Sequence, residues 1–156
     1  MNPFKAWVSD TPMFIVWRGT DKSPVDPLRP DVRSNAQDRA TWLQYDVAAE
    51  YARSLGAGYG VGVVLHDGCG LLCVDIDGCV DADRRLSPIA LQLIRDARRH
   101  CPDCYVELSM SGRGVHIIGP YRGEPPPHST KNQEHGIELY TTRRYIALTG
   151  VPCPPI

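Results

Sequence analysis

The run "LLCVDID", residues 71–77, is the feature of this sequence that most restricts how the chain can fold. Its apolar residues are typical of a buried strand, yet it ends in Asp75 and Asp77. Because side chains alternate along a strand, the two aspartates lie on one face and Val74 and Ile76 on the other. Two carboxylates on one face repel each other, so they either share a cation or stay in water at the end of the strand.

Two later segments repeat this pattern of an ionisable residue among apolar ones. His116 stands between apolar residues in "GVHII", and Glu138 does so in "GIELY". If these strands are neighbours of the first, Asp75, Asp77 and Glu138 form a cluster of carboxylates close to His116. Oxygen ligands of this kind suit Mg²⁺ or Mn²⁺, and pairs of such ions serve phosphoryl transfer. Taken singly, a residue of this kind more often belongs to the solvated face of a half-exposed sheet, and only the joint occurrence favours a site.

The order of apolar segments predicts an α+β fold with a largely antiparallel sheet, because runs of strands alternate with single helices. One helix is expected over residues 40–56, where Leu43, Val47 and Tyr51 recur at helical spacing. A second is expected over residues 86–101, which begin with a serine cap and a proline.

Strands are expected in most of the remaining apolar segments. The expected strands are 13–17, 104–110, 114–119, 136–140 and 144–150, together with two within 59–77 that the turn "HDGCG" joins as a hairpin. The segments 18–40 and 120–135 are rich in proline and polar residues, so we expect loops there.

The charge balance gives no general attraction to nucleic acid but is compatible with a local basic surface. The formal net charge is -1 over 156 residues, while arginine, which binds phosphate through its planar fork, far outnumbers lysine. Candidate cations are Lys22, Arg113 and the pair Arg143 and Arg144. Arg113 lies in the turn "SMSGRGV", whose hydroxyls and free backbone N–H groups are compatible with an anion-binding concavity, although the segment taken alone is better explained as an ordinary hairpin turn.

The apolar segments and the cysteines bear on the compartment. No apolar run is long enough to span a membrane and the N-terminus lacks the pattern of a signal peptide, so we expect a cytoplasmic protein with free thiols. The segment "HCPDC" places His100, Cys101 and Cys104 at the spacing of half a zinc site. A second pair of ligands at such spacing is missing, so structural zinc is not expected.

Three segments, taken in order, resemble a known family. "VLHDGCGLLCVDIDGC", "ELSMSGRGVHIIG" and "GIELYTTRRYIALTG" resemble the N-terminal catalytic domain of bifunctional DNA primase–polymerases, found in phages, plasmids and other mobile elements. These enzymes belong to the archaeo-eukaryotic primase superfamily. The stretch "DKSPVDPLRPDVRSNAQDRATW" also resembles the family's region before the first helix, so the resemblance covers residues 13–150.

The resemblance implies a fold and a domain organisation. It implies an RRM-like, palm-like sheet that is largely antiparallel, with helices packed on it and an N-terminal α/β unit. The catalytic domain would span residues 1–150. Residues 151–156, "VPCPPI", would begin a linker to a C-terminal region, which in many relatives contains a helicase.

The resemblance also implies a role for each matching residue. Asp75, Asp77 and Glu138 match the acids that bind two Mg²⁺ or Mn²⁺ ions, and His116 matches the histidine that contacts the phosphates of the incoming nucleotide. The wider superfamily often has S-x-H in this motif, whereas the primase–polymerase branch commonly has the S-G-x-G-x-H form seen here. The other expected nucleotide-binding residues are Ser109, Ser111, Arg113, Arg144 and Lys22.

We therefore expect a DNA primase or polymerase that takes a DNA template and primer and nucleoside triphosphates, with the 3′-hydroxyl attacking the α-phosphate as pyrophosphate leaves. A metal-dependent nuclease or phosphodiesterase would use a similar cluster of acids and histidine. A non-catalytic nucleic-acid-binding module would instead carry the acids as surface residues. A triphosphate site formed by His116, Arg113 and Arg144 around one metal ion would favour the polymerase.

Overall fold

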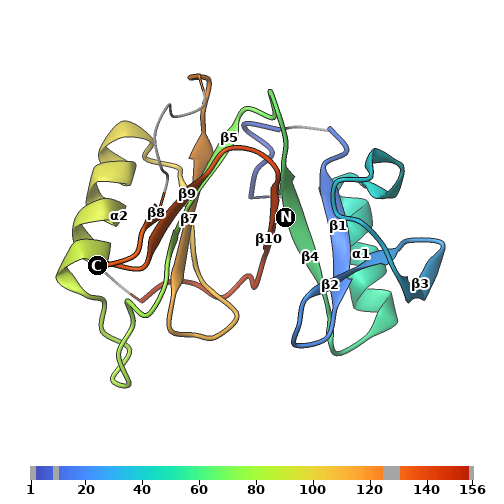
Figure 1. Cartoon of the computed structure of the whole chain (residues 1–156), viewed down its shortest axis with the longest axis horizontal. Coiled ribbons are helices and arrows are strands. Elements are labelled where there is room, and N and C mark those ends of the chain that lie inside the picture. The colour runs from blue at the N-terminus through green and yellow to red at the C-terminus, as the bar shows by residue number, and fades with distance from the viewer. Residues whose placement is uncertain (1–2, 9–10, 125–130, 155–156) are drawn as a thin grey trace. The chain divides into compact units, whose positions relative to one another are not determined.

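The structure, a computed structural model, describes residues 3–8, 11–124 and 131–154. Within these residues the chain forms two five-stranded antiparallel sheets and two α-helices (Figure 1), so the predicted α+β class is confirmed. The chain divides into two compact units. Unit 1 comprises Met1–Asp67 and Thr142–Leu148, and unit 2 comprises Gly68–Thr141 and Thr149–Ile156.

Unit 1 is a sheet with one α-helix packed on it. Its strands are β1 (Phe14–Arg18), β2 (Ser23–Asp26), β3 (Arg29–Arg33), β4 (Tyr59–Leu65) and β10 (Arg144–Ala147), in the spatial order β10-β4-β1-β2-β3. Helix α1 (Tyr45–Leu55) packs against β1 and β4, and the short 3₁₀ helix η1 (Arg39–Thr41) precedes it. The central strand β1 is almost wholly buried, which its uninterrupted apolar sequence explains.

Helix α1 begins later than the sequence predicted. Leu43, expected on its apolar face, instead forms a β-bridge with Phe14 before the helix starts. Val47 is half exposed, and the buried side chains of the helix are Ala48 and Ala52. The small alanines allow the helix backbone to approach the sheet, so the buried stripe is narrower than the apolar periodicity implied.

The segment 18–40, expected to be a loop, contains β2 and β3. The Asp26 carboxylate closes the turn between these strands by accepting hydrogen bonds from the Leu28 N–H and the Arg29 guanidinium. The prediction was wrong here because Pro24 and Pro30 interrupt the apolar alternation by which a strand is recognised.

Unit 2 is a second sheet with one face covered by a helix. Its strands are β5 (Leu71–Ile76), β6 (Tyr105–Leu108), β7 (Val115–Pro120), β8 (Lys131–Asn132) and β9 (Ile137–Tyr140), in the order β6-β7-β5-β9-β8. Helix α2 (Pro88–His100) is capped at its N-terminus by Ser87, whose Oγ accepts a hydrogen bond from the Ala90 N–H. Its buried face packs on Ile76, Val115 and Ile117 of the sheet. The alternate residues of these strands therefore project from the opposite face.

The predicted hairpin across "HDGCG" does not form. Strand β4 pairs with β1 and β10, while β5 pairs with β7 and β9, so the turn joins two different sheets. Gly68 and Gly70 adopt positive φ angles there, as turn glycines do. An Asp-Gly pair predicts a local reversal of the chain but does not decide which strands pair.

Two further segments differ in detail from their expectation. Within the predicted loop 120–135, Lys131–Asn132 form the short edge strand β8, while residues 125–130 lie outside the described part. In the segment expected to begin a linker, the Val151 carbonyl accepts the Leu108 N–H, and Cys153 packs against the core of unit 2. Residues 155–156 lie outside the described part.

The cysteines and the helices complete the description. All six cysteines are free thiols, and burial raises the pKa of Cys73 well above its ordinary value. Burial also raises the pKa of Cys79 to about 11. Among the described residues, neither α-helix has the length and apolarity that crossing a bilayer requires.

The packing of α2 on the sheet predicts a large effect of truncating Ile94, which is fully buried. We expect Ile94→Ala to lower the free energy of unfolding of unit 2 by about 2–5 kcal/mol, because a cavity replaces the lost side chain. The neighbouring Arg95→Ala is the control, since Arg95 is exposed. Urea denaturation measures both variants, and equal stabilities would contradict the packing described.

Candidate catalytic site

A single row of ionisable side chains crosses the sheet of unit 2, with one residue from each strand. On the central strand β5, Asp75 is directly opposite His116 of β7 and Glu138 of β9. The row continues to Glu107 on β6 and to Lys131 on β8. Directly opposite residues project from the same face of a sheet, so all five side chains lie on the face away from α2.

The exposure of these side chains increases along the row. The exposed fraction is 1% for Glu107, 8% for His116, 22% for Asp75, 25% for Glu138 and 53% for Lys131. The row therefore has a dry end and a solvent-accessible end. A ligand that arrives from solvent reaches the carboxylates of Asp75 and Glu138 without passing the buried carboxylate of Glu107.

Glu107 is a candidate residue that the sequence interpretation missed. It is fully buried and directly opposite His116. Its Oε1 lies 3.0 Å from the Nδ1 atom of His116. The sequence "YVELS" carries the same signal that identified His116 and Glu138, an ionisable residue alternating with apolar ones.

His116 lies between two carboxylates. Its Nδ1 atom faces Glu107, and its Nε2 atom lies 3.7 Å from Oδ1 of Asp75. The second distance is longer than a hydrogen bond, so Nε2 faces the Asp75 carboxylate without a direct hydrogen bond. The imidazole therefore connects the buried end of the row to the acidic centre.

Asp77 follows β5 directly and lies beside Glu138. Its backbone N–H donates to the carbonyl of Gly136, and its side chain is exposed. A small cavity of about 40 Å³ is lined by residues that include Asp77, Glu138 and Lys131. Within it the ammonium of Lys131 lies 2.6 Å from Oε1 of Glu138, so a cation already contacts this carboxylate.

The residues fit a hard cation in chemistry but not yet in side-chain position. Among the described residues, no three His, Cys, Asp or Glu side chains form a group that could hold a metal ion as they stand. The donors of Asp75, Asp77 and Glu138 are nevertheless carboxylate oxygens, which Mg²⁺ and Mn²⁺ prefer. To bind such an ion, Glu138 would have to exchange the Lys131 ammonium for it.

The serine loop between β6 and β7 is more self-contained than the sequence predicted. The Ser109 hydroxyl accepts the N–H of Gly114, and the Ser111 hydroxyl accepts the N–H of Arg113. The Gly112 N–H donates to the Ser109 carbonyl. The expectation of free backbone donors is therefore wrong for these three groups, because the loop's own oxygens accept from them. The nucleotide-binding role of Ser109, Ser111 and the exposed Arg113 stays a prediction.

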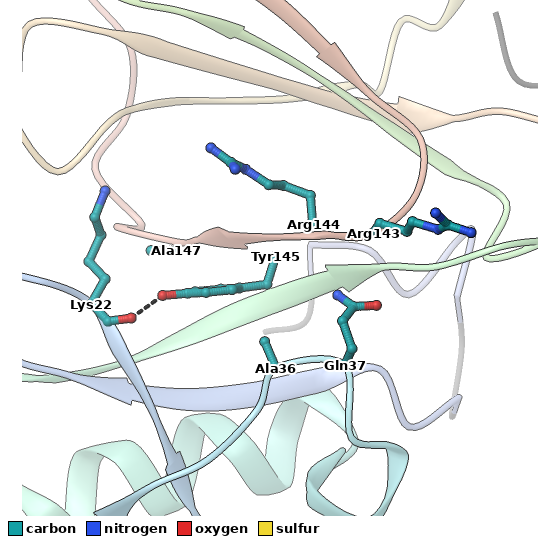
Figure 2. Close-up of a pocket in the computed structure, with 7 residues that line it drawn as sticks. All are labelled: Lys22, Ala36, Gln37, Arg143, Arg144, Tyr145 and Ala147. Carbon is teal, nitrogen blue, oxygen red and sulfur yellow. Dashed lines mark hydrogen bonds between the residues drawn. The ribbon is translucent and has the colours of Figure 1, made fainter.

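Lys22 and Arg144 belong to unit 1, where they line one pocket of about 370 Å³. Figure 2 shows Arg143 and Arg144 extending in different directions from the start of β10, with Tyr145 beneath them. The Tyr145 hydroxyl donates a hydrogen bond to the carbonyl of Lys22. Burial raises the pKa of Tyr145, and the nearby Asp21 carboxylate raises it further, so the phenol keeps its proton at neutral pH.

Backbone strain is concentrated at this pocket. Lys22 and Arg143 have φ angles of 54° and 53°, in the left-handed region that non-glycine residues seldom adopt. Among the described residues the only other such case is Arg84. Strained residues cluster at sites where function requires a particular side chain. Arg143 was a candidate cation in the sequence, and the geometry places it beside the two residues expected to bind nucleotide.

The candidate residues are thus divided between the units. Unit 2 contains the acids, the histidine and the serine loop, namely Asp75, Asp77, Glu138, His116, Ser109, Ser111 and Arg113, whereas unit 1 contains Lys22 and Arg144. Compared with known proteins, the chain matches no family model, and no curated protein shows significant similarity to it. Function is therefore inferred from the motifs and the geometry.

The close packing beside Asp77 predicts that Gly114 tolerates no side chain. A Cβ atom there would lie 2.8 Å from Ser109 Oγ and 2.9 Å from the Ile76 carbonyl oxygen. We expect Gly114→Ala to lower the free energy of unfolding by about 1–3 kcal/mol, because strand β5 or the loop must move. Gly119→Ala is the control, since its added Cβ would have no neighbour closer than 3.8 Å. Urea titrations that find the two variants equally stable would argue against this packing.

Proposed function

We propose that this chain is a catalytic domain for metal-dependent, template-directed nucleotidyl transfer, the reaction of DNA primases and polymerases. The register of β5 carries the proposal, because it sets Asp75 directly between His116 and Glu138, while Asp77 follows the strand and lines one cavity with Glu138. These are the residues whose sequence segments resemble the primase–polymerase motifs. The resemblance and the register are independent observations, since a sequence motif does not specify which strands pair.

The strand order of unit 2 supports the finer assignment to an RRM-like palm of the archaeo-eukaryotic primase type. If β5, β6, β7 and β9 are numbered one to four along the chain, their spatial order is four, one, three, two. Helix α2 follows the first of these strands and covers the face opposite the acidic row. This is the order of a ferredoxin-like or RRM-like sheet, which leaves one face open for a ligand.

In this proposal the carboxylates of unit 2 are the metal ligands. Asp75, Asp77 and Glu138 would hold the ions, and Glu138 would release Lys131 to do so. Two bound divalent ions would stabilise the attacking 3′-hydroxyl oxygen and the leaving pyrophosphate oxygen. The chain's own part is to fix the carboxylates in one row, while His116 and the Arg113 loop contact phosphate oxygens.

The cationic pocket of unit 1 supports a phosphate-bearing substrate. Lys22, Arg143 and Arg144 line the same pocket. A guanidinium group can donate two parallel hydrogen bonds to the oxygens of a phosphate. A hydrolase acting on a simple diester has less need of three further cations than an enzyme that binds a triphosphate and a template. We therefore assign this pocket to nucleoside triphosphate or template phosphates.

The decisive experiment is primer extension. With a primed DNA template, Mg²⁺ or Mn²⁺ and each nucleotide type, the wild-type domain is expected to extend the primer, and Asp75→Ala with Asp77→Ala is expected to abolish extension. Asp103→Ala is the matched control, because Asp103 is an exposed carboxylate of the same unit. Extension by the double variant, or its absence from the wild type, would refute the assignment. Degradation of the primer instead would identify a nuclease, and the same reaction without primer tests priming.

The pocket of unit 1 gives a separate prediction. Arg144→Ala and Lys22→Ala are each expected to raise KM for the nucleotide by about 10- to 100-fold, the loss expected for a hydrogen bond to a charged group. Arg29→Ala is the control, because this exposed arginine pairs with Asp26 outside the pocket. Steady-state extension rates measure the effect. An unchanged KM in both pocket variants would remove unit 1 from nucleotide binding.

A further inference from the structure

The carboxylate of Glu107 accepts more hydrogen bonds than the pairing of its strand requires. Burying a carboxylate is costly unless donors replace the lost water. Here the donors come from β6 itself and from the chain after β10. Oε2 accepts from the Tyr105 hydroxyl at 2.8 Å, from the Thr149 N–H at 3.0 Å and from the Gly150 N–H at 2.9 Å, while the Thr149 hydroxyl donates to the Leu108 carbonyl at 2.7 Å.

This arrangement distinguishes the two oxygens of Glu107. Oε2 accepts from three donor groups, none of which belongs to His116. Oε1 accepts from His116 Nδ1 at 3.0 Å and shares the Thr149 N–H at 3.2 Å. Since two of the donors are backbone N–H groups, which cannot follow the side chain, the carboxylate cannot rotate without losing both of these hydrogen bonds. Oε1 is therefore held in place facing the imidazole.

The consequence for His116 is that its ring has one orientation. A carboxylate only accepts hydrogen bonds, so Nδ1 must carry the proton that Glu107 receives. The other nitrogen, Nε2, then faces Asp75 at the centre of the acidic row. A carboxylate that orients a histidine through its second nitrogen is a common device in active sites.

We propose that Glu107 is a positioning residue, which fixes the ring of His116 with a protonated Nδ1 toward the interior and Nε2 toward the acidic row. Glu107 itself contacts no substrate. The segment Thr149–Gly150 belongs to the same device, because it holds the carboxylate from the side opposite the histidine. The orientation follows from the hydrogen bonds alone, and only its effect on rate rests on the proposed function.

The variant Glu107→Gln tests this directly, because it keeps the shape of the side chain. The glutamine oxygen must face the donors of Thr149 and Gly150, so its NH₂ group faces Nδ1 of His116. Nδ1 then has to accept, and the ring proton moves to Nε2. We expect long-range ¹H–¹⁵N NMR at pH 8 to show a protonated Nδ1 in the wild type and an unprotonated Nδ1 in Glu107→Gln.

Kinetics and a control variant separate positioning from a structural role. In an active enzyme, Glu107→Gln is expected to lower kcat/KM by about 10- to 100-fold, the usual cost of losing such a partner. Tyr105→Phe removes one donor to Oε2 and leaves the histidine contact, so it is expected to lower the melting temperature while Nδ1 stays protonated.

Each outcome decides a different statement. A wild-type Nδ1 without a proton, or a Glu107→Gln variant that keeps the Nδ1 proton, would overturn the inference whether or not the enzyme is active. Wild-type kcat/KM in Glu107→Gln would overturn the catalytic importance of the orientation. Absence of extension by the wild type would refute the proposed function instead, and the NMR comparison would still decide the role of Glu107.

Discussion

The site depends on the register of β5 between its two neighbours. Because side chains alternate along a strand, a slip by one residue would turn Asp75 toward α2 and bring Val74 and Ile76 to the face that carries the acidic row. The buried contacts of Ile76 with α2 make such a slip unfavourable. The hydrophobic core beneath the sheet therefore fixes the acidic row above it. Alternate residues of β5 therefore have two different roles: one set packs in the hydrophobic core, and the other set belongs to the acidic row.

The row is organised by a gradient of burial. At its buried end the Glu107 carboxylate accepts hydrogen bonds from hydroxyl and backbone donors. These donors fix the orientation of the carboxylate and, through it, that of His116. At its exposed end the Glu138 carboxylate pairs with the ammonium of Lys131, whose side chain is about half exposed. The first partnership is rigid and the second is exchangeable. Such an arrangement suits a site in which a fixed histidine stands beside carboxylates that must accept a cation.

Unit 1 contributes a different kind of chemistry. Its pocket is cationic, and two of its basic residues hold the backbone in a strained conformation that glycine would adopt more easily. The Tyr145 hydroxyl secures the Lys22 carbonyl, so the strained turn is held from a neighbouring part of the sheet. The proposed reaction needs both sets of groups, acids for the ions and cations for the phosphates.

The sequence by itself determined which residues are chemically informative. Alternation in three short apolar runs identified Asp75, His116 and Glu138, because the period of a strand is local and is unaffected by which strands pair. The cap and proline of α2 and its apolar face were local signals of the same kind. The α+β class followed from the order of these segments.

Only the tertiary structure decided which strands are neighbours. It separated β4 from β5 despite the turn between them, and it brought β7 and β9 to the two sides of β5. It also paired backbone N–H groups of the serine loop with the loop's own oxygens. In addition, it placed Thr149 and Gly150 against Glu107. Apart from the serine-loop hydrogen bonds, which are local, these contacts join residues that are far apart in the chain, so no local pattern could have encoded them.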